Sequence, residues 1–337
     1  METWRAALRD DLLPWLLERS DPAVRHLALR DLLDQPEDAP EVRRARTSAM
    51  RSGPIATTLA AQDPAGFWVK PGAGYAAKYT GTVWSLIFLE QMGADAGDPR
   101  IRAACEYVLT HAITDSGGFG MSGSTSERPP PPSTVVHCLN GNLLRSMIAF
   151  GWLDDERVRR AIVWEASAIT GDGHDRFFAS TTSAPSFACG VNGGEPCGWG
   201  AAKAMRGLAA IPPRRRTKQV REAVETGIGF LLSVDPATAA YPTATSISSS
   251  WFKLGFPSGY VADVLQVGED LADLGKARDP RLANTVDFVV SKQTPGGRWL
   301  NEYSYAGKTW FDVDRRGEPS KWVTLRAMRF LRAALGG

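Results

Sequence analysis

A segment of similar character occurs five times along this chain at a nearly constant spacing. Each copy opens with small or turn-forming residues and continues with apolar residues at intervals of three and four, which is typical of a helix entered from a loop. The copies begin at Tyr79, Cys138, Cys197, Pro257 and Ser320, so successive copies are separated by 59, 59, 60 and 63 residues. This period indicates a repeat protein whose helical units stack on one another.

A second, more charged helical series lies between these segments. Its members are expected to start at Asp98, Asp154, Thr217 and Asp279. A side-chain oxygen at a helix entrance accepts a hydrogen bond from a free backbone N–H group, and an Asp also complements the positive end of the helix dipole. One apolar inner helix and one charged outer helix per repeat, about five times over, predict an all-α fold, an α/α toroid of five to six helical hairpins.

The expected element boundaries follow from the same patterns. The predicted inner helices cover residues 79–93, 138–151, 197–210, 257–274 and 320–335, and helices are also expected over residues 4–18, 21–34 and 40–61. With 337 residues, 43% of them hydrophobic, the chain can bury a substantial core. We therefore expect a single toroid domain over residues 1–337, in which residues 1–61 form helices that pack on the ring.

Two predicted outer helices end in the same short motif. Residues 62–68 read QDPAGFW and residues 293–299 read QTPGGRW, so both follow the pattern Q-x3-G-x-W. In such a motif Gly turns the chain, Trp packs over the helix end and Gln hydrogen-bonds across the turn. Together with the alternating helices, the motif resembles the terpenoid cyclase superfamily of squalene/hopene cyclases and protein prenyltransferase β-subunits, whose fold is an α/α toroid with a central cavity.

Three further phrases are similar to those of uncharacterised prenyltransferase/squalene-oxidase-repeat proteins within that superfamily. They are CLNGN at 138–142, KLGFPSGY at 253–260 and GEPSKWVTLRAMR at 317–329. The resemblance implies an isomerase or cyclase that acts on an isoprenoid. Of the cyclases' acidic D-x-D-D segment, however, this chain has only Asp312-Val-Asp314-Arg315, and it lacks the D-x-C pair with which prenyltransferases bind zinc.

Three of the four cysteines suggest a metal site. Cys138 and Cys197 occupy the same position in consecutive inner helices, and Cys189 precedes Cys197 by eight residues across a Gly-rich loop that can fold back. Helix N-termini favour the thiolate, which is a preferred ligand of zinc. We therefore predict one zinc ion at one mouth of the toroid, bound by these three cysteines. The candidates for the fourth ligand are a water molecule, His137, Asp172 and Asp175.

The cysteines also admit a simpler interpretation, in which they pack as small hydrophobic residues. We expect this of Cys105, which lies on an outer helix. The N-terminal sequence METWRAALRDDLLPW lacks a signal-peptide core, and no apolar run approaches the roughly 20 residues of a membrane span. These features favour a cytoplasmic protein, in which cysteines are thiols or metal ligands. The formal net charge of +2 gives no reason to expect a nucleic-acid partner.

Three charged residues fall at the same depth in consecutive inner helices. Lys203, Asp263 and Arg326 each stand six residues beyond the start of their repeat segment. If this depth faces the lumen, they form a charged cluster in an apolar cavity, where pKa values shift. We predict that Lys203 contacts Asp263 and that all three residues are catalytic, with Lys203 as a base or as an amine that forms a Schiff base. The alternative is an ion pair that only fixes the register of the helices.

The loops that enter the inner helices are rich in aromatic and polar residues, which suit a small apolar or aromatic ligand. The predicted substrate-binding residues are Tyr79, Trp199, Trp251, Lys253, Tyr260, Tyr303, Lys308 and Trp310. These features favour an enzyme of lyase or hydrolase type that acts on such a molecule in the central cavity, with zinc as the candidate cofactor. Two alternatives stay open, namely an isoprenoid isomerase or cyclase and a non-catalytic toroid that binds a lipid or peptide.

Overall fold

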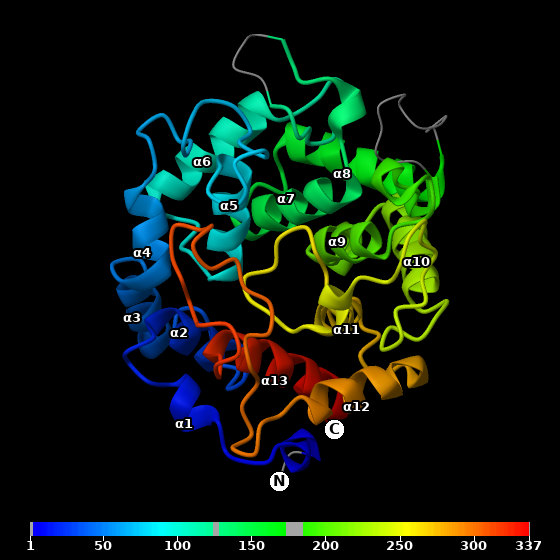
Figure 1. Ribbon diagram of the computed structural model, residues 1–337. Coiled ribbons are helices and arrows are strands. Elements are labelled where there is room, and N and C mark those ends of the chain that lie inside the picture. The colour runs from blue at the N-terminus through cyan, green and yellow to red at the C-terminus, as the bar shows by residue number, and fades with distance from the viewer. Residues whose placement is uncertain (1–2, 124–127, 173–184, 337) are drawn as a thin grey trace.

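The computed structural model of the chain describes residues 3–123, 128–172 and 185–336. Within these residues the fold is all-helical, with thirteen α-helices, several short 3₁₀ helices and, in place of strands, only isolated bridges. The helices form a ring of two layers around a centre that is crossed by loops (Figure 1). The predicted all-α toroid is therefore confirmed.

Six helices of the described chain form the inner layer of the ring. They are α2 (Pro22–Asp31), α5 (Thr82–Gln91), α7 (His137–Ala149), α9 (Gly198–Ala209), α11 (Val264–Asp273) and α13 (Lys321–Leu335). From α5 to α13, each inner helix packs against the next one along the chain, and α13 also packs against α2. At the other side of α2, Leu27 lies against Gly93 directly after α5. Helix α2 thus closes the ring, although the sequence placed it among helices that pack on the ring.

The outer layer consists of helices whose starts follow the expected capping chemistry. Its members are α3 (Pro40–Ala49), α4 (Gly53–Ala60), α6 (Pro99–His111), α8 (Glu156–Thr170), α10 (Lys218–Leu231) and α12 (Ala283–Ser291), and a short α1 (Leu13–Leu16) precedes α2. Asp98 accepts the Arg100 N–H at the start of α6, and Thr217 accepts the Val220 N–H at the start of α10. Helix α8 is capped by Asp155 rather than by the predicted Asp154.

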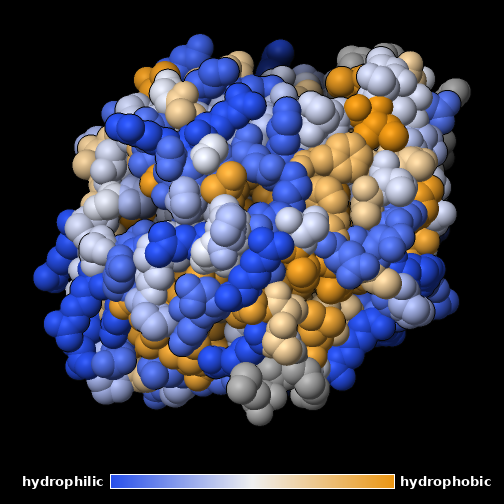
Figure 2. All heavy atoms as spheres, turned by 60° about the horizontal axis from the view of Figure 1, so that its bottom comes forward, coloured by the Kyte–Doolittle hydropathy of each residue, from blue (hydrophilic) through white to orange (hydrophobic). Residues whose placement is uncertain are grey.

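The surface of the molecule accords with an apolar interior. On the face shown in Figure 2, hydrophilic residues cover most of the area, and hydrophobic residues lie in groups between them. In the described residues, no helix combines the length and the hydropathy that crossing a membrane would require. The apolar stripes of the helices are instead buried against one another in one large core.

Two of the predicted N-terminal helices are interrupted. Residues 4–18 form a 3₁₀ helix, Thr3–Ala7, and then α1, because Pro14 has no N–H group with which to continue a helix from the preceding residues. Residues 40–61 divide into α3 and α4 at Gly53, which has φ +69° and is followed by Pro54. A positive φ ends a right-handed helix. The continuous helices predicted over 4–18 and 40–61 were therefore wrong.

The inner helix predicted from Pro257 begins only at Val264. Asp263 caps it by accepting the Gln266 N–H at 2.7 Å. The residues before it form a loop, 254–263, which enters the centre of the ring beside a second loop, 300–311 (Figure 1). The two loops are paired where the Glu302 N–H donates to the Leu254 carbonyl at 2.7 Å.

An aromatic cluster fills the centre of the ring where these loops meet the inner helices. The ring centroids of Tyr79 and Tyr305 lie 4.0 Å apart, and Tyr79 also lies 5.1 Å from Trp84 of α5. Phe88, one turn further along α5, lies 6.1 Å from Tyr305. All four side chains are buried. The centre of the lumen is therefore packed rather than hollow, and a cavity lies toward each of its ends.

The tryptophans of the two Q-x3-G-x-W motifs pack over the helix ends, as predicted. Trp68 and Trp299 are both fully buried. The indole N–H of Trp68 donates to the Thr58 carbonyl of α4 at 2.7 Å, and that of Trp299 donates to the Val289 carbonyl of α12, also at 2.7 Å. The two copies of the motif thus tie the loop after an outer helix to that helix in the same way.

The glutamines of the motif link each repeat to the next, so the predicted hydrogen bonds across the turn of the motif were wrong. Gln62 Nε2 donates to the Arg100 carbonyl at the start of α6 at 2.9 Å. Gln293 Nε2 donates to the Ala7 carbonyl at 2.9 Å, and its Oε1 accepts the Arg9 N–H at 3.0 Å. Because Ala7 and Arg9 belong to the start of the chain, the second glutamine joins the last repeat to the first.

This difference between the two glutamines leads to a stability prediction. Replacing Gln293 by Leu (Gln293→Leu) removes the three hydrogen bonds of a buried side chain and leaves the Ala7 carbonyl and the Arg9 N–H without this partner, so we expect a loss of about 2 kcal/mol in the free energy of unfolding. The matched variant Gln62→Leu removes one exposed bond, and we expect a loss below about 1 kcal/mol. Urea denaturation followed by circular dichroism measures both values. Equal losses would show that Gln293 has no special part in closing the ring.

Candidate functional site

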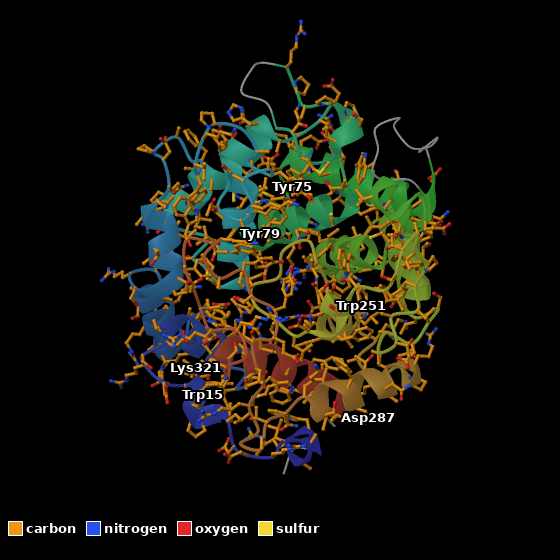
Figure 3. The ribbon with its side chains drawn as sticks, in the orientation of Figure 1. Trp15, Tyr75, Tyr79, Trp251, Asp287 and Lys321 are labelled. Carbon is orange, nitrogen blue, oxygen red and sulfur yellow. The ribbon has the colours of Figure 1, made fainter. Side chains whose placement is uncertain are left out.

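A cavity of about 460 Å³ opens at the end of the ring where α7 and α9 begin. Its aromatic walls come from Tyr75, Trp199, Tyr241, Trp251 and Tyr260. Figure 3 shows that Tyr75 and Trp251 come from different sides of the ring. We call this space the aromatic cavity. Its size and walls are those of a site for a small, largely apolar molecule.

The structure places the predicted substrate-binding residues in different parts of the molecule. Trp199, Trp251 and Tyr260 line the aromatic cavity, whereas the other five residues do not. Tyr79 lies in the central aromatic cluster, and the indole N–H of Trp310 donates to the Thr80 carbonyl. Lys253 and Tyr303 border a crevice of only about 10 Å³, which is too small for a ligand, and Lys308 is exposed.

The structure brings together the four residues that the sequence placed at one mouth. His137, Cys138, Cys189 and Cys197 all line the aromatic cavity. The loop between the last two cysteines folds back as expected, because the Cys197 N–H donates to the Phe187 carbonyl at 2.9 Å. Cys105, in contrast, is buried in α6, as predicted for a core residue.

The arrangement of these four residues does not fit a metal ion. Among the described residues, no group of three or more His, Cys, Asp and Glu side chains is placed to hold one. His137 Nδ1 is engaged by the Glu165 carboxylate at 2.6 Å, and the Cys197 sulfur accepts the Gly200 N–H at 3.3 Å. Asp175 lies outside the described residues. Zinc therefore stays a prediction from the sequence, and we derive no chemical step through it.

The thiols of the aromatic cavity differ strongly in acidity. The pKa of Cys189 is lowered to about 6, because Cys197 donates a hydrogen bond to its sulfur and the Asn192 and Val191 N–H groups also point to it. The same hydrogen bond and burial raise the pKa of Cys197. Burial raises the pKa of Cys138 to about 12. Cys189 is therefore the thiolate of this set at neutral pH, and the other two are thiols.

Behind the cavity wall, a buried carboxylate holds His137 in place. Glu165 of α8 is fully buried, and its Oε1 lies 2.6 Å from His137 Nδ1. The other carboxylate oxygen accepts a hydrogen bond from the Asn140 amide at 2.5 Å. An imidazole whose Nδ1 is bound to a carboxylate is fixed in tautomer and orientation and exchanges protons through Nε2. The ring of His137 is thus held in one orientation at the wall of the aromatic cavity.

The predicted charged cluster exists, but its pairing differs from the prediction. Arg326 of α13 forms a bidentate ion pair with Asp263, with both N–O distances 3.1 Å, and also binds Glu269 at 2.8 Å. Lys203 forms no ion pair with Asp263. The predicted Lys203–Asp263 contact was wrong because α11 begins at Val264, which makes Asp263 a helix cap and places Glu269 at the depth of Arg326.

Lys203 instead donates to two uncharged groups. Its Nζ lies 2.6 Å from Ser258 Oγ and 2.5 Å from Gln266 Oε1, and the side chain is fully buried. Burial and, to a smaller extent, the nearby Arg206 guanidinium lower the pKa of Lys203 to about 7. The lysine is therefore present both as an ammonium and as a neutral amine at neutral pH.

A second cavity, of about 310 Å³, lies at the end of the ring where the inner helices terminate. Its lining includes the arginines and acids Arg30, Asp31, Arg145, Arg206, Glu269, Asp273, Arg326 and Arg329, together with Ser258. We call it the charged cavity. Guanidinium groups at this end are stabilised by the negative ends of the helix dipoles.

Several residues of these two sites were not identified from the sequence. They are Glu165, Ser258, Gln266 and Asp270. The first three stand between apolar or small neighbours, whereas Asp270 follows Glu269. A single acid such as Glu165 in the apolar run IVWEASAI is a signal for a buried carboxylate. Its partner, however, lies on another helix and could not be read from the sequence.

Three solved structures resemble the fold at low sequence identity. A protein from Actinoplanes and the type II terpene cyclase MstE from Scytonema each have 15% identity and a TM-score of 0.44 over 93% of this chain, covering 90% and 87% of their own lengths. The GH76 α-mannanase of Bacteroides thetaiotaomicron has 12% identity and a TM-score of 0.40 over 79% of this chain and 70% of its own.

Two further comparisons, with protein families and with curated protein sequences, gave no match. The three solved structures include two kinds of enzyme that act on very different molecules. At such low similarity we draw nothing from them about the chemistry of this chain.

The buried Asp270 provides a test of the electrostatics beside the charged cavity. Burial raises the pKa of Asp270 to about 7, although Arg206 and Lys203 oppose the shift. Between about pH 4 and pH 7 the folded state therefore keeps a proton that the unfolded state has released, so stability falls as the pH rises, by up to about 1.4 kcal/mol per pH unit. We expect Asp270→Asn to remove this slope in urea denaturation at pH 5, 6 and 7.

The control for this experiment is Asp287→Asn, on the exposed side of the outer helix α12 (Figure 3). This variant should keep the slope of the wild-type protein. Parallel pH profiles for wild type and Asp270→Asn would contradict the raised pKa.

Proposed function

We propose that this chain is an enzyme of hydrolase type that binds a small, largely apolar acyl compound in the aromatic cavity and cleaves it with Cys189. The observation that carries the proposal is a thiol of lowered pKa on the wall of an aromatic cavity of about 460 Å³. The thiolate is the nucleophilic form of cysteine. The proposed enzyme class therefore rests on Cys189 and on the aromatic cavity beside it.

The substrate class follows from the lining of the cavity. The rings of Trp199, Trp251 and Tyr260 would contact an apolar or aromatic body. Lys78 borders the same cavity, and its ammonium lies 4.3 Å from the ring centroid of Tyr260. A positive charge at this edge suits a substrate whose carbonyl or leaving group gains negative charge.

His137 and Glu165 would complete the catalytic group. The arrangement follows the general logic of a nucleophile, a base and an orienting carboxylate. Glu165 holds Nδ1, so His137 would exchange protons through Nε2. Cys197 would stabilise the thiolate through the hydrogen bond that lowers the pKa of Cys189.

The proposed reaction has two steps. The Cys189 sulfur forms a bond to the carbonyl carbon, the bond to the leaving group breaks, and the leaving atom takes a proton from His137. A water molecule then attacks the thioester and gives one proton to His137, which restores the imidazolium. The carboxylic acid product leaves and Cys189 is a thiolate again, so that the sum of the two steps is hydrolysis.

The isoprenoid cyclase alternative has less support from the geometry. Cyclases of that type protonate an alkene with an acid in the substrate cavity, and the nearest acidic segment here contains Asp312 and Asp314. Burial raises the pKa of Asp314 to about 6, but its carboxylate accepts a hydrogen bond from Ser320 at 2.6 Å and neither Asp lines the aromatic cavity. A non-catalytic binder is the outcome expected if ligands bind without turnover.

The proposal predicts which thiol supports turnover. We expect the wild-type protein to hydrolyse 4-nitrophenyl butyrate, and Cys189→Ala to reduce kcat/KM at least about 100-fold because the nucleophile is removed. Cys138→Ala is the matched control, since Cys138 lies on the same wall with a raised pKa, and it should retain activity. Loss of activity in both variants, or in neither, would remove Cys189 from the mechanism.

Chelation separates this proposal from the zinc prediction. Activity should be unchanged after dialysis against EDTA if the thiolate acts alone. If activity is lost and returns with added zinc, the metal-assisted hydrolase predicted from the sequence is supported instead.

A second prediction concerns the acidity of Cys189. In wild type, the rate of its alkylation by iodoacetamide should rise through about pH 6 and level off near pH 7, because the thiolate is then fully formed. Cys197→Ala removes the hydrogen-bond donor, so the same rise should move to higher pH. Peptide mass spectrometry measures the labelling of each cysteine. An unchanged profile in Cys197→Ala would show that the hydrogen bond does not determine the pKa.

A further inference from the structure

A serine on the wall of the charged cavity contacts a buried lysine, and the proposed thiol chemistry uses neither residue. Ser258 lines this cavity of about 310 Å³, and Lys203 lies behind it. Lys203 Nζ lies 2.6 Å from Ser258 Oγ. A neutral lysine at this distance can accept the hydroxyl proton and so make the serine nucleophilic.

The serine is held rigidly at the cavity wall. Its N–H donates to Gln91 Oε1 at 2.8 Å, and its carbonyl accepts from Gln91 Nε2, also at 2.8 Å. The side chain of Ser258 donates toward Gln266 Oε1, at 2.9 Å, or the Val261 carbonyl, at 3.2 Å. A nucleophile that is fixed on both its backbone and its side chain loses little entropy when it reacts.

A hydrogen-bond donor without a partner lies beside this serine. Gln266 is fully buried, and its Nε2 makes no hydrogen bond within the described part of the chain. The Oε1 of the same amide contacts both Ser258 and Lys203. A buried donor of this kind costs free energy unless a water or a ligand oxygen accepts its hydrogen bond.

The surroundings of Lys203 hold its pKa near neutrality, so a part of the lysine is present as the neutral amine. Burial, Arg206 and Arg326 lower its pKa, while Asp270 and Asp263 partly oppose them, and the pKa lies at about 7. These groups come from its own helix α9, from α11 with its cap, and from α13. A base whose pKa is near the operating pH is well matched to proton transfer.

One guanidinium at the cavity wall is available to a ligand. Arg206 is 14% exposed and lies 3.7 Å from Glu90 and 3.8 Å from Asp270, distances too long for hydrogen bonds. Within the described chain, its side chain makes no hydrogen bond that would occupy its donors. Arginine binds carboxylates through two parallel N–H groups. A ligand carboxylate at hydrogen-bond distance would use the donors that the longer ion-pair contacts with Glu90 and Asp270 leave without hydrogen bonds.

We propose that the charged cavity is a second reaction site, in which Ser258 is the nucleophile and Lys203 its base, acting on small esters that carry a carboxylate. Lys203 takes the hydroxyl proton, Ser258 Oγ bonds to the ester carbon, and the alkoxide leaves with the proton from Lys203. Water then attacks the acyl-serine, the bond between the acyl carbon and Ser258 Oγ breaks, and one proton of the water passes through Lys203 to Ser258 Oγ as the acid is released. Arg206 binds the carboxylate of the substrate throughout.

The test uses the full chain and an alkyl fluorophosphonate, which forms an oxygen–phosphorus bond to an activated serine and releases fluoride. We expect one adduct, mapped by mass spectrometry to Ser258, in wild type and in Cys189→Ala. The labelling rate should rise as the pH passes through about 7, because Lys203 loses its proton there. Ser258→Ala should give no adduct, and Lys203→Met should slow labelling at least about 100-fold. No adduct on Ser258 in folded wild type would overturn the proposal.

Turnover tests the substrate class separately. In the Cys189→Ala background, mono(4-nitrophenyl) succinate should be hydrolysed at least about tenfold faster than 4-nitrophenyl butyrate, and Arg206→Met should abolish the preference. Equal rates for both esters would overturn the assignment to carboxylate esters. If Lys203→Met does not fold, Ser258→Cys replaces it. The new thiol beside Lys203 should then react with iodoacetamide at pH 7 faster than Cys138, and an inert thiol would also overturn the proposal.

Because the turnover assays and one arm of the labelling experiment use Cys189→Ala, their outcome does not depend on the thiol hydrolase proposed for the aromatic cavity. Loss of activity on the neutral ester in Cys189→Ala supports that first proposal, whereas labelling of Ser258 supports the second.

Discussion

The structure depends on closure of the ring between its last inner helix, α13, and its first, α2. A helical hairpin in such a ring buries its apolar face only when it has a neighbour on each side. Without closure, α13 and α2 would each leave an apolar surface in water. The hydrogen bonds between Gln293 and the chain at Ala7 and Arg9 bind the same two repeats on the outside of the ring.

Closure creates an interior that the inner helices alone do not fill. The two loops 254–263 and 300–311 and the aromatic cluster around Tyr79 and Tyr305 occupy it. Since an unfilled apolar lumen would lose dispersion contacts along its whole lining, this packing stabilises the ring. It also separates the two ends of the lumen, so that the aromatic cavity and the charged cavity have different linings.

The inner helices are aligned, and their dipoles suit the charges at each end. The aromatic cavity lies at helix N-termini and contains the Cys189 thiolate, whereas the charged cavity lies at helix C-termini and contains guanidinium groups. The helix dipoles favour the thiolate at one end and the guanidinium groups at the other. The acids of the charged cavity, Asp31, Glu269 and Asp273, are paired with arginines instead. Between the ends, Arg326 binds Asp263 and also donates to the Gly255 carbonyl at 2.6 Å, so a buried ion pair holds the loop that carries Ser258. Loop 254–263 is therefore held by the ion-paired Arg326 and also carries the proposed nucleophile Ser258.

The sequence by itself determined the periodic helices, the caps at Asp98 and Thr217, the tryptophan contacts of the Q-x3-G-x-W motifs and the meeting of Cys138, Cys189 and Cys197 at one mouth. These features depend on residues close in sequence or on a constant period, and local sterics and hydrogen bonding dictate both. Only the tertiary structure decided that Lys203 contacts Ser258 rather than Asp263 and that Glu165 holds His137. Those pairs join residues 55 and 28 positions apart on different elements. Their register depends on where α11 starts and on how α7 packs against α8, which no local pattern specifies.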